Sequence, residues 1–346
     1  MIKEMVPTRV DPATADREFW NRYHEFRRVE QAEVRPDDPL RPDEQAAAVL
    51  KKGDPFRIHE WYEISRDGRM LSWYHGELVA PNNPEYATNK HLYDADFYVI
   101  PDVRGTGIGR AWLPLISERM RAHGCTTVGF WVELDVGRGF LKWLGAEAKL
   151  NEIESRLTLS EVDWSMVERW VGEGKERSPQ TKLEIYDGLM PDAMLVDFAP
   201  QLSSLLNTIP FEALDHGEII ITPEMIREWN VRLQLAGEVQ HTVITREPGG
   251  VISGVTDVTW APYRRQLIYQ QFTGVRPDAR GRGIGKWIKA AMLLHLRELY
   301  PDAEWVSTEN AGSNAPMLKI NRTLGFKPHR NGTAYQMTLE ALEARL

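Results

Sequence analysis

The chain has 346 residues, more than one hydrophobic core usually spans, so its length predicts two domains. Its formal net charge of −8 argues against a general nucleic-acid binder, because such proteins carry a basic surface excess. The single cysteine, Cys125, excludes an intramolecular disulfide and a multi-cysteine zinc site and fits a reducing compartment. No apolar run is suited to secretion or long enough to span a bilayer, so we expect a cytoplasmic protein that binds no membrane.

The first half of the chain alternates helix-like and strand-like segments around one glycine-rich stretch, RGTGIGR at 104–110. Two helices and a hairpin that turns at Asp67-Gly68 come before this stretch, and the run WSMVERWV is predicted to be the helix that closes the half. Around the stretch, the pattern predicts a strand over 94–100, a helix over about 110–123, a strand over 126–134 and a short helix ending at Leu144-Gly145.

The second half repeats this order around a second glycine-rich stretch, RGRGIGK at 280–286. A charged segment without periodicity, 171–182, predicts the link between the halves. The pattern then predicts a hairpin turning at 248–250, a strand over 266–275, a helix over 286–299, a strand over 303–310 and a short helix ending at Leu324-Gly325. The shared order indicates a long-period internal duplication.

Each glycine-rich turn stands at the start of a helix, where several backbone N–H groups have no partner within the helix. Together with the helix dipole, these groups favour a phosphate or pyrophosphate, and glycines let such a ligand approach the backbone. A P-loop requires Ser or Thr after Gly-Lys, but Trp287 follows Lys286. A dinucleotide-binding fingerprint reads G-x-G-x-x-G, whereas both stretches here read R-G-x-G-x-G.

The remaining pattern, Arg-x-x-Gly-x-Gly, resembles the acyl-CoA-binding motif of the GNAT acetyltransferase superfamily. In the second half the preceding strand, the following helix and NAGSNAPMLKINRTLGF (310–326) also resemble consecutive family elements. Two such domains in one chain are similar to the tandem layout of mycothiol synthase and related proteins. The resemblance implies an α/β (α+β) fold with two domains, 1–165 and 180–346, each a mixed, mainly antiparallel sheet flanked by helices.

The resemblance also implies an acetyl-CoA site in the second half, with the pyrophosphate on the glycine turn and the pantetheine arm on the strand before it. Arg282 and Lys286 are expected to add positive charge, and Asn314 to contact the CoA arm. The predicted CoA-binding residues are Thr273, Gly274, Val275, Arg280, Gly281, Arg282, Gly283, Ile284, Gly285, Lys286 and Asn314, with Val99, Arg104, Gly105, Thr106, Gly107, Ile108 and Gly109 as the counterpart in the first half.

The second half is predicted to be the main catalytic unit, because the first offers mainly Leu134, Asp135 and Gly137 where the second has polar residues. The candidate catalytic residues are Glu309, Asn310 and Asn321. Asn321 stands where the family commonly has a tyrosine that protonates the departing thiolate, and an asparagine cannot act as an acid. Asp257, His216 and Glu212 remain alternative candidates for the base.

The expected reaction is direct attack of an amine on the thioester of acetyl-CoA, without a covalent enzyme intermediate and without a metal. A small-molecule amine is the preferred acceptor. A protein or peptide N-acetyltransferase and a non-catalytic acyl-CoA-binding regulator stay as alternatives.

Overall fold

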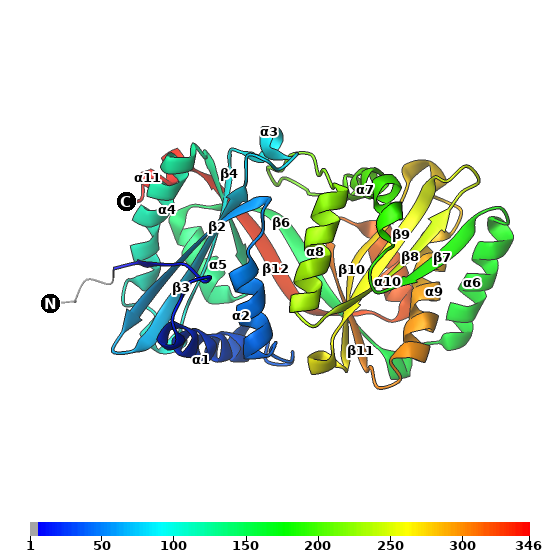
Figure 1. Ribbon diagram of the computed structural model, residues 1–346, viewed down its shortest axis with the longest axis horizontal. Coiled ribbons are helices and arrows are strands. Elements are labelled where there is room, and N and C mark those ends of the chain that lie inside the picture. Colours follow the sequence, from blue (N-terminus) through cyan, green and yellow to red (C-terminus); the bar gives the residue numbers. More distant parts are fainter. Residues whose placement is uncertain (1–5) are drawn as a thin grey trace. The chain divides into compact units, whose positions relative to one another are not determined.

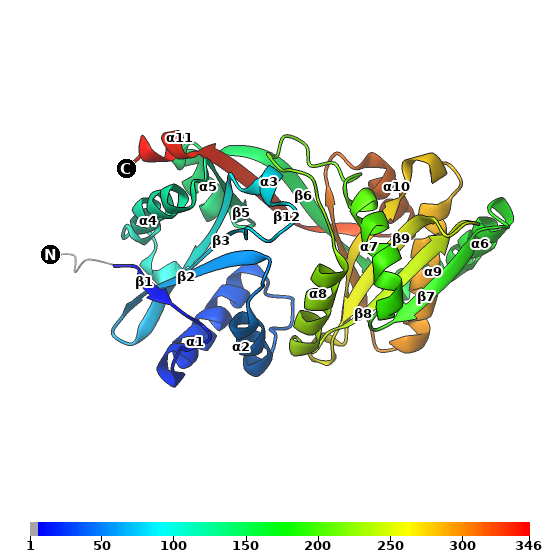
Figure 2. The ribbon, with the colours of Figure 1, turned by 45° about the horizontal axis from the view of Figure 1, so that its top comes forward.

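The computed structural model describes residues 6–346, which form two compact units. The first unit comprises the described residues up to Asn151 together with Ala213–Glu218 and Gly332–Leu346. The second comprises Glu152–Glu212 and Ile219–Asn331. Figures 1 and 2 show the ribbon from two directions. Among residues 6–346, no helix is long and apolar enough to cross a membrane.

The first unit contains a sheet in the order β1-β2-β3-β4-β5-β12, in which only β4 and β5 run parallel. Its strands are β1 (Thr8–Val10), β2 (Arg57–Arg66), β3 (Arg69–Val79), β4 (Leu92–Val99), β5 (Thr127–Val132) and the end of β12 (Lys327–Thr338). Its helices are α1 (Arg17–Val34), α2 (Asp43–Lys52), α3 (Tyr86–Asn89), α4 (Ile108–His123), α5 (Asp135–Leu144) and α11 (Leu339–Glu343).

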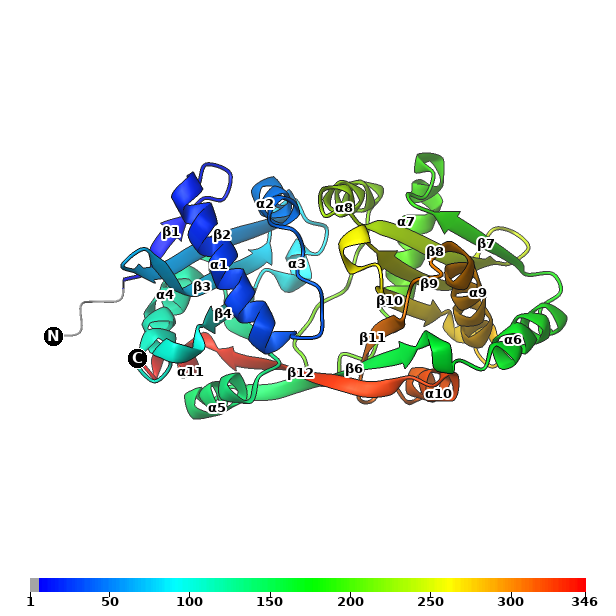
Figure 3. The same cartoon turned by 90° about the horizontal axis from the view of Figure 1, so that it is seen from below.

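Helices cover both faces of this sheet, with α1 and α4 on opposite sides (Figure 3). Successive residues of a strand point to opposite faces. Trp73 of β3 accordingly packs against Phe19 of α1, while its neighbour Tyr74 stacks on Trp112 of α4 at a centroid distance of 5.2 Å. The core of the unit therefore has a layer on each face of the sheet, and aromatic side chains take part in both.

The second unit repeats the arrangement with the order β6-β11-β10-β9-β8-β7, in which only β10 and β11 run parallel. Its strands are β6 (Glu147–Thr158), β7 (Lys182–Asp187), β8 (Val239–Arg246), β9 (Ile252–Trp260), β10 (Leu267–Val275) and β11 (Trp305–Ala311). Its helices are α6 (Trp164–Arg177), α7 (Asp192–Leu206), α8 (Pro223–Leu235), α9 (Ile284–Leu299) and α10 (Ala315–Leu324). The mixed, mainly antiparallel sheets flanked by helices confirm the predicted fold class.

The last strand of each sheet comes from the other half of the sequence. Residues 333–338 of β12 pair with β5, and residues 152–158 of β6 pair with β11. The compact units therefore differ from the predicted ranges 1–165 and 180–346, which follow the duplication in the sequence and contain no such exchange.

The predicted link at 171–182 is wrong over most of its length, because α6 continues to Arg177. The helix persists because it packs closely on α9: a Cβ built on Gly174 would lie 2.3 Å from the Trp287 ring. Charged residues at its end occupy the exposed side of a packed helix, and β7 begins at Lys182 after a short turn.

Candidate functional site

The first glycine turn connects the end of β4 to the start of α4. Gly105 and Gly107 adopt left-handed φ values of +76° and +98°, and Gly107 is the N-cap of α4. A Cβ built on Gly107 would face open space, whereas one on Gly109 would lie 3.3 Å from the Phe140 ring. Gly105 and Gly107 thus shape an open turn, and Gly109 permits close packing of α4 against α5.

The sheet opens beside this turn. The paired residues of β4 and β5 end at Asp94 and Gly129, while the strands continue to Val99 and Val132. The diverging strands leave backbone groups of β4 free of ladder bonds to β5, which is the arrangement an extended ligand arm needs for strand-like hydrogen bonds.

A cavity of about 740 Å³ lies at this opening, within the size range of small-molecule sites. Its wall contains every residue predicted for CoA binding in the first half: Val99, Arg104, Gly105, Thr106, Gly107, Ile108 and Gly109. The structure therefore brings together the glycine turn, the helix N-terminus and the opened strands around one space.

Three carboxylates line the cavity: Glu30 from α1, Asp96 from β4, and Glu133, which accepts a 2.6 Å hydrogen bond from Arg35. The Asp96 side chain is open to the cavity, and the protein atoms that surround it desolvate its carboxylate, which raises its pKa to about 7. Desolvation likewise raises the pKa of Glu30 to about 7, with further repulsion from Asp96 and Glu133. Asp96 also accepts a hydrogen bond from the Trp131 backbone N–H at 3.3 Å, which fixes the carboxylate across the strand opening.

Arg104 anchors the turn to its surroundings. Its Nε donates to the Val99 carbonyl at 3.0 Å, and its two terminal nitrogens donate to the Glu33 carboxylate on α1. Glu33 also accepts from Tyr98, and the hydrogen bond from Arg104 lowers its pKa. The guanidinium therefore ties α1, β4 and the turn into one rigid wall.

The second glycine turn has the same backbone but different surroundings. Gly281 and Gly283 have φ values of +82° and +85°, and Gly283 is the N-cap of α9. Here a Cβ on Gly283 would lie 3.4 Å from a terminal nitrogen of Arg177, so a side chain from α6 stands over the turn. Gly285 has the same packing role as Gly109, because a Cβ built on it would lie 3.3 Å from the Ile320 side chain of α10.

The basic residues of the second turn have partners in their own unit. Arg282 donates to Glu247, Ser178 and Thr181, and Lys286 lies 4.8 Å from the centre of the Trp170 ring. Arg280 repeats one bond of Arg104, donating from Nε to the Val275 carbonyl at 3.3 Å.

The strand before the second turn also opens from its neighbour, since β10 and β11 pair only as far as Gln270 and Thr308. The Thr273 hydroxyl bonds that of Thr256 at 2.8 Å, and the Phe272 ring closes over the backbone of Gly274. Phe272 packs against an apolar cluster supplied by α7, α8, β8 and β9. Counting back equally from the two motifs, Phe272 occupies the position that Asp96 has in the first unit.

The predicted catalytic residues of the second half lie along β11 and α10. Glu309 is exposed on β11, and Asn310 accepts a 2.6 Å hydrogen bond from the Asn321 amide. Asn321 is buried, and its own oxygen accepts no hydrogen bond from residues 6–346. Asn314 caps α10, because its side-chain oxygen accepts a hydrogen bond from the Met317 N–H at 3.4 Å. This oxygen therefore already has a partner within the helix.

The three alternative bases have different surroundings. Asp257 is buried and accepts from Gln240 and from the Phe272 N–H, and Glu212 accepts from the Ser313 N–H. His216 lies in the segment 213–218, which belongs to the first unit, although it was a candidate base for the second half.

Sequence reasoning missed Glu30 and Asp96. The available signal for Asp96 was an acid inside the strand-like run DADFYV, where an apolar residue is usual. Glu30 had no such signal, because it lies on a charged helix far from Asp96 in the sequence.

Comparison with known proteins gives a match to the family model "Acetyltransferase (GNAT) family" over residues 20–145. No curated protein matches the chain. A tandem GNAT protein from the clavulanic acid biosynthesis pathway has a similar structure, with a TM-score of 0.72 and 19% identity, covering 97% of this chain and 99% of that chain.

Two further solved structures share the fold. A GCN5-related N-acetyltransferase from Sphaerobacter thermophilus matches with a TM-score of 0.60 and 14% identity, covering 96% of this chain and 95% of that one. A GCN5-related glucosamine N-acetyltransferase region of a fungal multi-domain GH3 β-N-acetylglucosaminidase matches with a TM-score of 0.62 and 13% identity, covering 97% of this chain and 38% of that one. Residues 20–145 thus match the model of the GNAT acetyltransferase family, and the chain shares the fold of a tandem GNAT protein.

Proposed function

We propose that the protein is an acyl-CoA-dependent N-acyltransferase that transfers acetyl from acetyl-CoA to the amine of a small molecule, and that the reaction takes place in the first unit. The observation that carries the proposal is the cavity in which the glycine turn, the opened strands and the carboxylates of Glu30 and Asp96 meet. The match of residues 20–145 to the GNAT family model supports the same chemistry.

In this proposal the N-terminus of α4 holds the pyrophosphate of CoA. The first-turn N–H groups and the helix dipole supply the positive potential, and Gly105 and Gly107 let the phosphates approach the backbone. The pantetheine arm follows β4 toward Asp96, in the opening between β4 and β5.

The carboxylates supply a base for the acceptor. An alkyl ammonium must lose a proton before its nitrogen can attack the thioester, and a carboxylate with a pKa near 7 accepts that proton at neutral pH. Asp96 is the leading candidate, because it is fixed at the strand opening, and Glu30 is the second. The thiolate of CoA then leaves with the proton supplied by the amine or by water.

The charges in the cavity support a cationic acceptor. Glu30, Asp96 and Glu133 all line it; Glu133 is paired with Arg35, Arg104 is bound to Glu33, and Arg110 lies over the Trp143 ring, so Glu30 and Asp96 set the sign of the charge. The negative potential that remains attracts an amine in its protonated form.

This placement departs from the expectation that the second half is the main catalytic unit. Two features favour the first unit: Arg177 stands over the second turn, and Phe272 takes the position of Asp96 within an apolar cluster. Glu309, Asn310 and Asn321 then have no part in the transfer that we propose.

The proposal is tested by measuring the release of free thiol from acetyl-CoA in the presence of a panel of small amines. The assay compares the unmodified protein with two variants, Gly107→Trp in the first turn and Gly283→Trp in the second. We expect amine-dependent thiol release that Gly107→Trp abolishes and Gly283→Trp leaves largely intact. Acetyl-CoA binding without turnover on any amine would favour the regulatory alternative, and loss only in Gly283→Trp would return the reaction to the second unit.

A further inference from the structure

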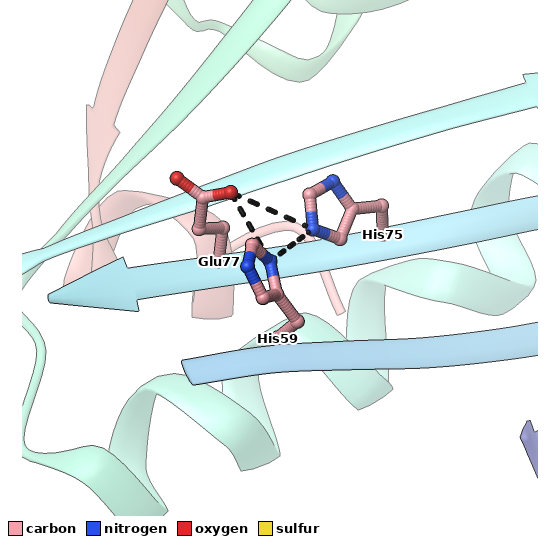
Figure 4. A group of neighbouring side chains, drawn as sticks. All are labelled: His59, His75 and Glu77. Carbon is pink, nitrogen blue, oxygen red and sulfur yellow. Dashed lines mark hydrogen bonds and ion pairs between the residues drawn. The ribbon is translucent and has the colours of Figure 1, made fainter. Parts of the chain in front are cut away.

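Three side chains outside the proposed CoA path converge on one point of the first unit. His59 comes from β2, and His75 and Glu77 come from β3 (Figure 4). His59 Nδ1 lies 2.9 Å from His75 Nε2 and 3.2 Å from Glu77 Oε2, and His75 Nε2 lies 3.7 Å from Glu77 Oε2. The side chains are only 13%, 22% and 23% exposed, respectively.

The backbone places these donors together without any loop. His59 pairs directly with Glu77 in the β2–β3 ladder, and His75 is two residues from Glu77, so all three side chains leave the same face of the sheet. A site built on paired strands is held by the sheet and requires little ordering when a ligand arrives.

Neighbouring side chains fix the orientation of the donors. Arg57 donates to Glu77 Oε1 at 2.7 Å, which leaves Oε2 directed at the two imidazoles. Trp61 stacks on the His75 ring at a centroid distance of 3.8 Å and an interplanar angle of 12°. Supporting contacts of this kind are what orient the ligands of protein metal sites.

Hydrogen bonding alone accounts poorly for the group. A proton on His59 Nδ1 can be directed at His75 or at Glu77 but cannot bond both well, and 3.7 Å between His75 and Glu77 is too long for a hydrogen bond. A cation accepts lone pairs from all three atoms at once.

The geometry fits a tetrahedrally coordinated ion. A point about 2.05 Å from all three donors lies roughly 0.7 Å out of their plane, which is the displacement of a tetrahedral ion with three protein ligands and one open position. Two imidazoles and one carboxylate are a donor set that Zn²⁺ accepts.

We propose that His59, His75 and Glu77 bind a divalent transition-metal ion, Zn²⁺ or a close analogue, with one coordination position open. His75 also lines the cavity, so the ion lies at the edge of the space assigned to the acceptor. The metal site rests on the donor geometry and does not depend on the proposed acyl transfer. It departs from the sequence-based expectation of a protein without a metal.

The test uses the full-length, untagged protein after treatment with a chelator. Co²⁺ serves as the probe, because its visible absorption reports tetrahedral coordination, and calorimetry with Zn²⁺ measures affinity and stoichiometry. We expect one tight equivalent per chain and displacement of Co²⁺ by Zn²⁺. His75→Gln and Glu77→Gln should each weaken binding at least ten-fold, with thermal melts confirming that both variants fold.

The matched control is His295→Gln, which changes the other group of possible ligands, Asp187, His241 and His295. This variant should bind Co²⁺ as the unmodified protein does. The proposal is overturned if the unmodified protein binds no stoichiometric metal, if both His75→Gln and Glu77→Gln bind it unchanged, or if binding is lost in His295→Gln instead. The first two results would leave the three side chains as a hydrogen-bonded group only.

Discussion

Among single residues, Asp96 marks the clearest difference between the two units, because the corresponding residue of the second unit is Phe272. The first unit has a carboxylate beside a cavity, and the second has Phe272 packed in an apolar cluster. We predict that Asp96→Asn lowers kcat about 100-fold, because the amide cannot accept the proton of the amine, with little change in the affinity for acetyl-CoA. Steady-state kinetics measure both quantities. Asp94→Asn, two residues earlier on the same strand face, is the control and should lower kcat far less. An equal fall in kcat in both variants would argue against a base at Asp96.

The pH dependence of turnover follows from the same residues. Desolvation raises the pKa of Asp96 and of Glu30 to about 7, and only the ionised form accepts a proton. In chelator-treated protein, kcat should therefore fall as the pH is lowered through about 7 and level off above it. A kcat that stays constant across this interval would show that neither carboxylate is the base.

These residues could be predicted from the sequence only in part. The glycine turns were predicted because a local pattern of Arg and Gly carries them. Glu30 and Asp96 line the same cavity because α1 packs on the sheet, and no sequence spacing encodes this. The same applies to His59, which meets His75 and Glu77 only through the register of β2 and β3.

At the scale of elements, the two glycine turns offer a matched pair of variants. Gly107 and Gly283 both have left-handed φ values at the N-cap of a helix, so alanine should strain both by about 1–2 kcal/mol. We predict similar losses of thermal stability for Gly107→Ala and Gly283→Ala but at least ten-fold weaker CoA binding only for Gly107→Ala. Calorimetric titration and thermal melts check this. Weaker CoA binding in Gly283→Ala alone would place the principal site on the second turn.

Most elements could be predicted from the sequence, because their local signals agree with their packing. The strands before each turn, the helices after them and the hairpin turning at Asp67-Gly68 all occur where expected, and Asp67 and Gly68 both have positive φ. The end of α6 could not be predicted, because its charged composition resembles a linker and its stability comes from contact with Trp287 of another helix.

At the scale of the whole molecule, the exchange of end strands ties the folding of each unit to the other half of the sequence. The first unit takes residues 333–338 of β12 and helix α11, whose Leu342 is buried in its core. We predict that a fragment of residues 1–165 does not fold cooperatively by itself, because β5 is left as an open edge. Co-expression with residues 166–346 should restore a cooperative transition. A fragment 1–165 that is monomeric and as stable as the intact chain would contradict this.

The exchange had no signal in the sequence. The duplication sets the order of elements within each half, but strand pairing across the halves depends on tertiary contacts. The local sequence pattern therefore predicts the fold class, but it does not predict which half supplies the last strand of each unit.

A crystal structure of the full-length protein grown with acetyl-CoA would show directly which unit binds the co-substrate. We expect the pyrophosphate against the N-terminus of α4 at residues 104–109, with the pantetheine between β4 and β5 and the thioester near Asp96. Density for CoA only against residues 280–285, with the cavity of the first unit unoccupied, would contradict this expectation.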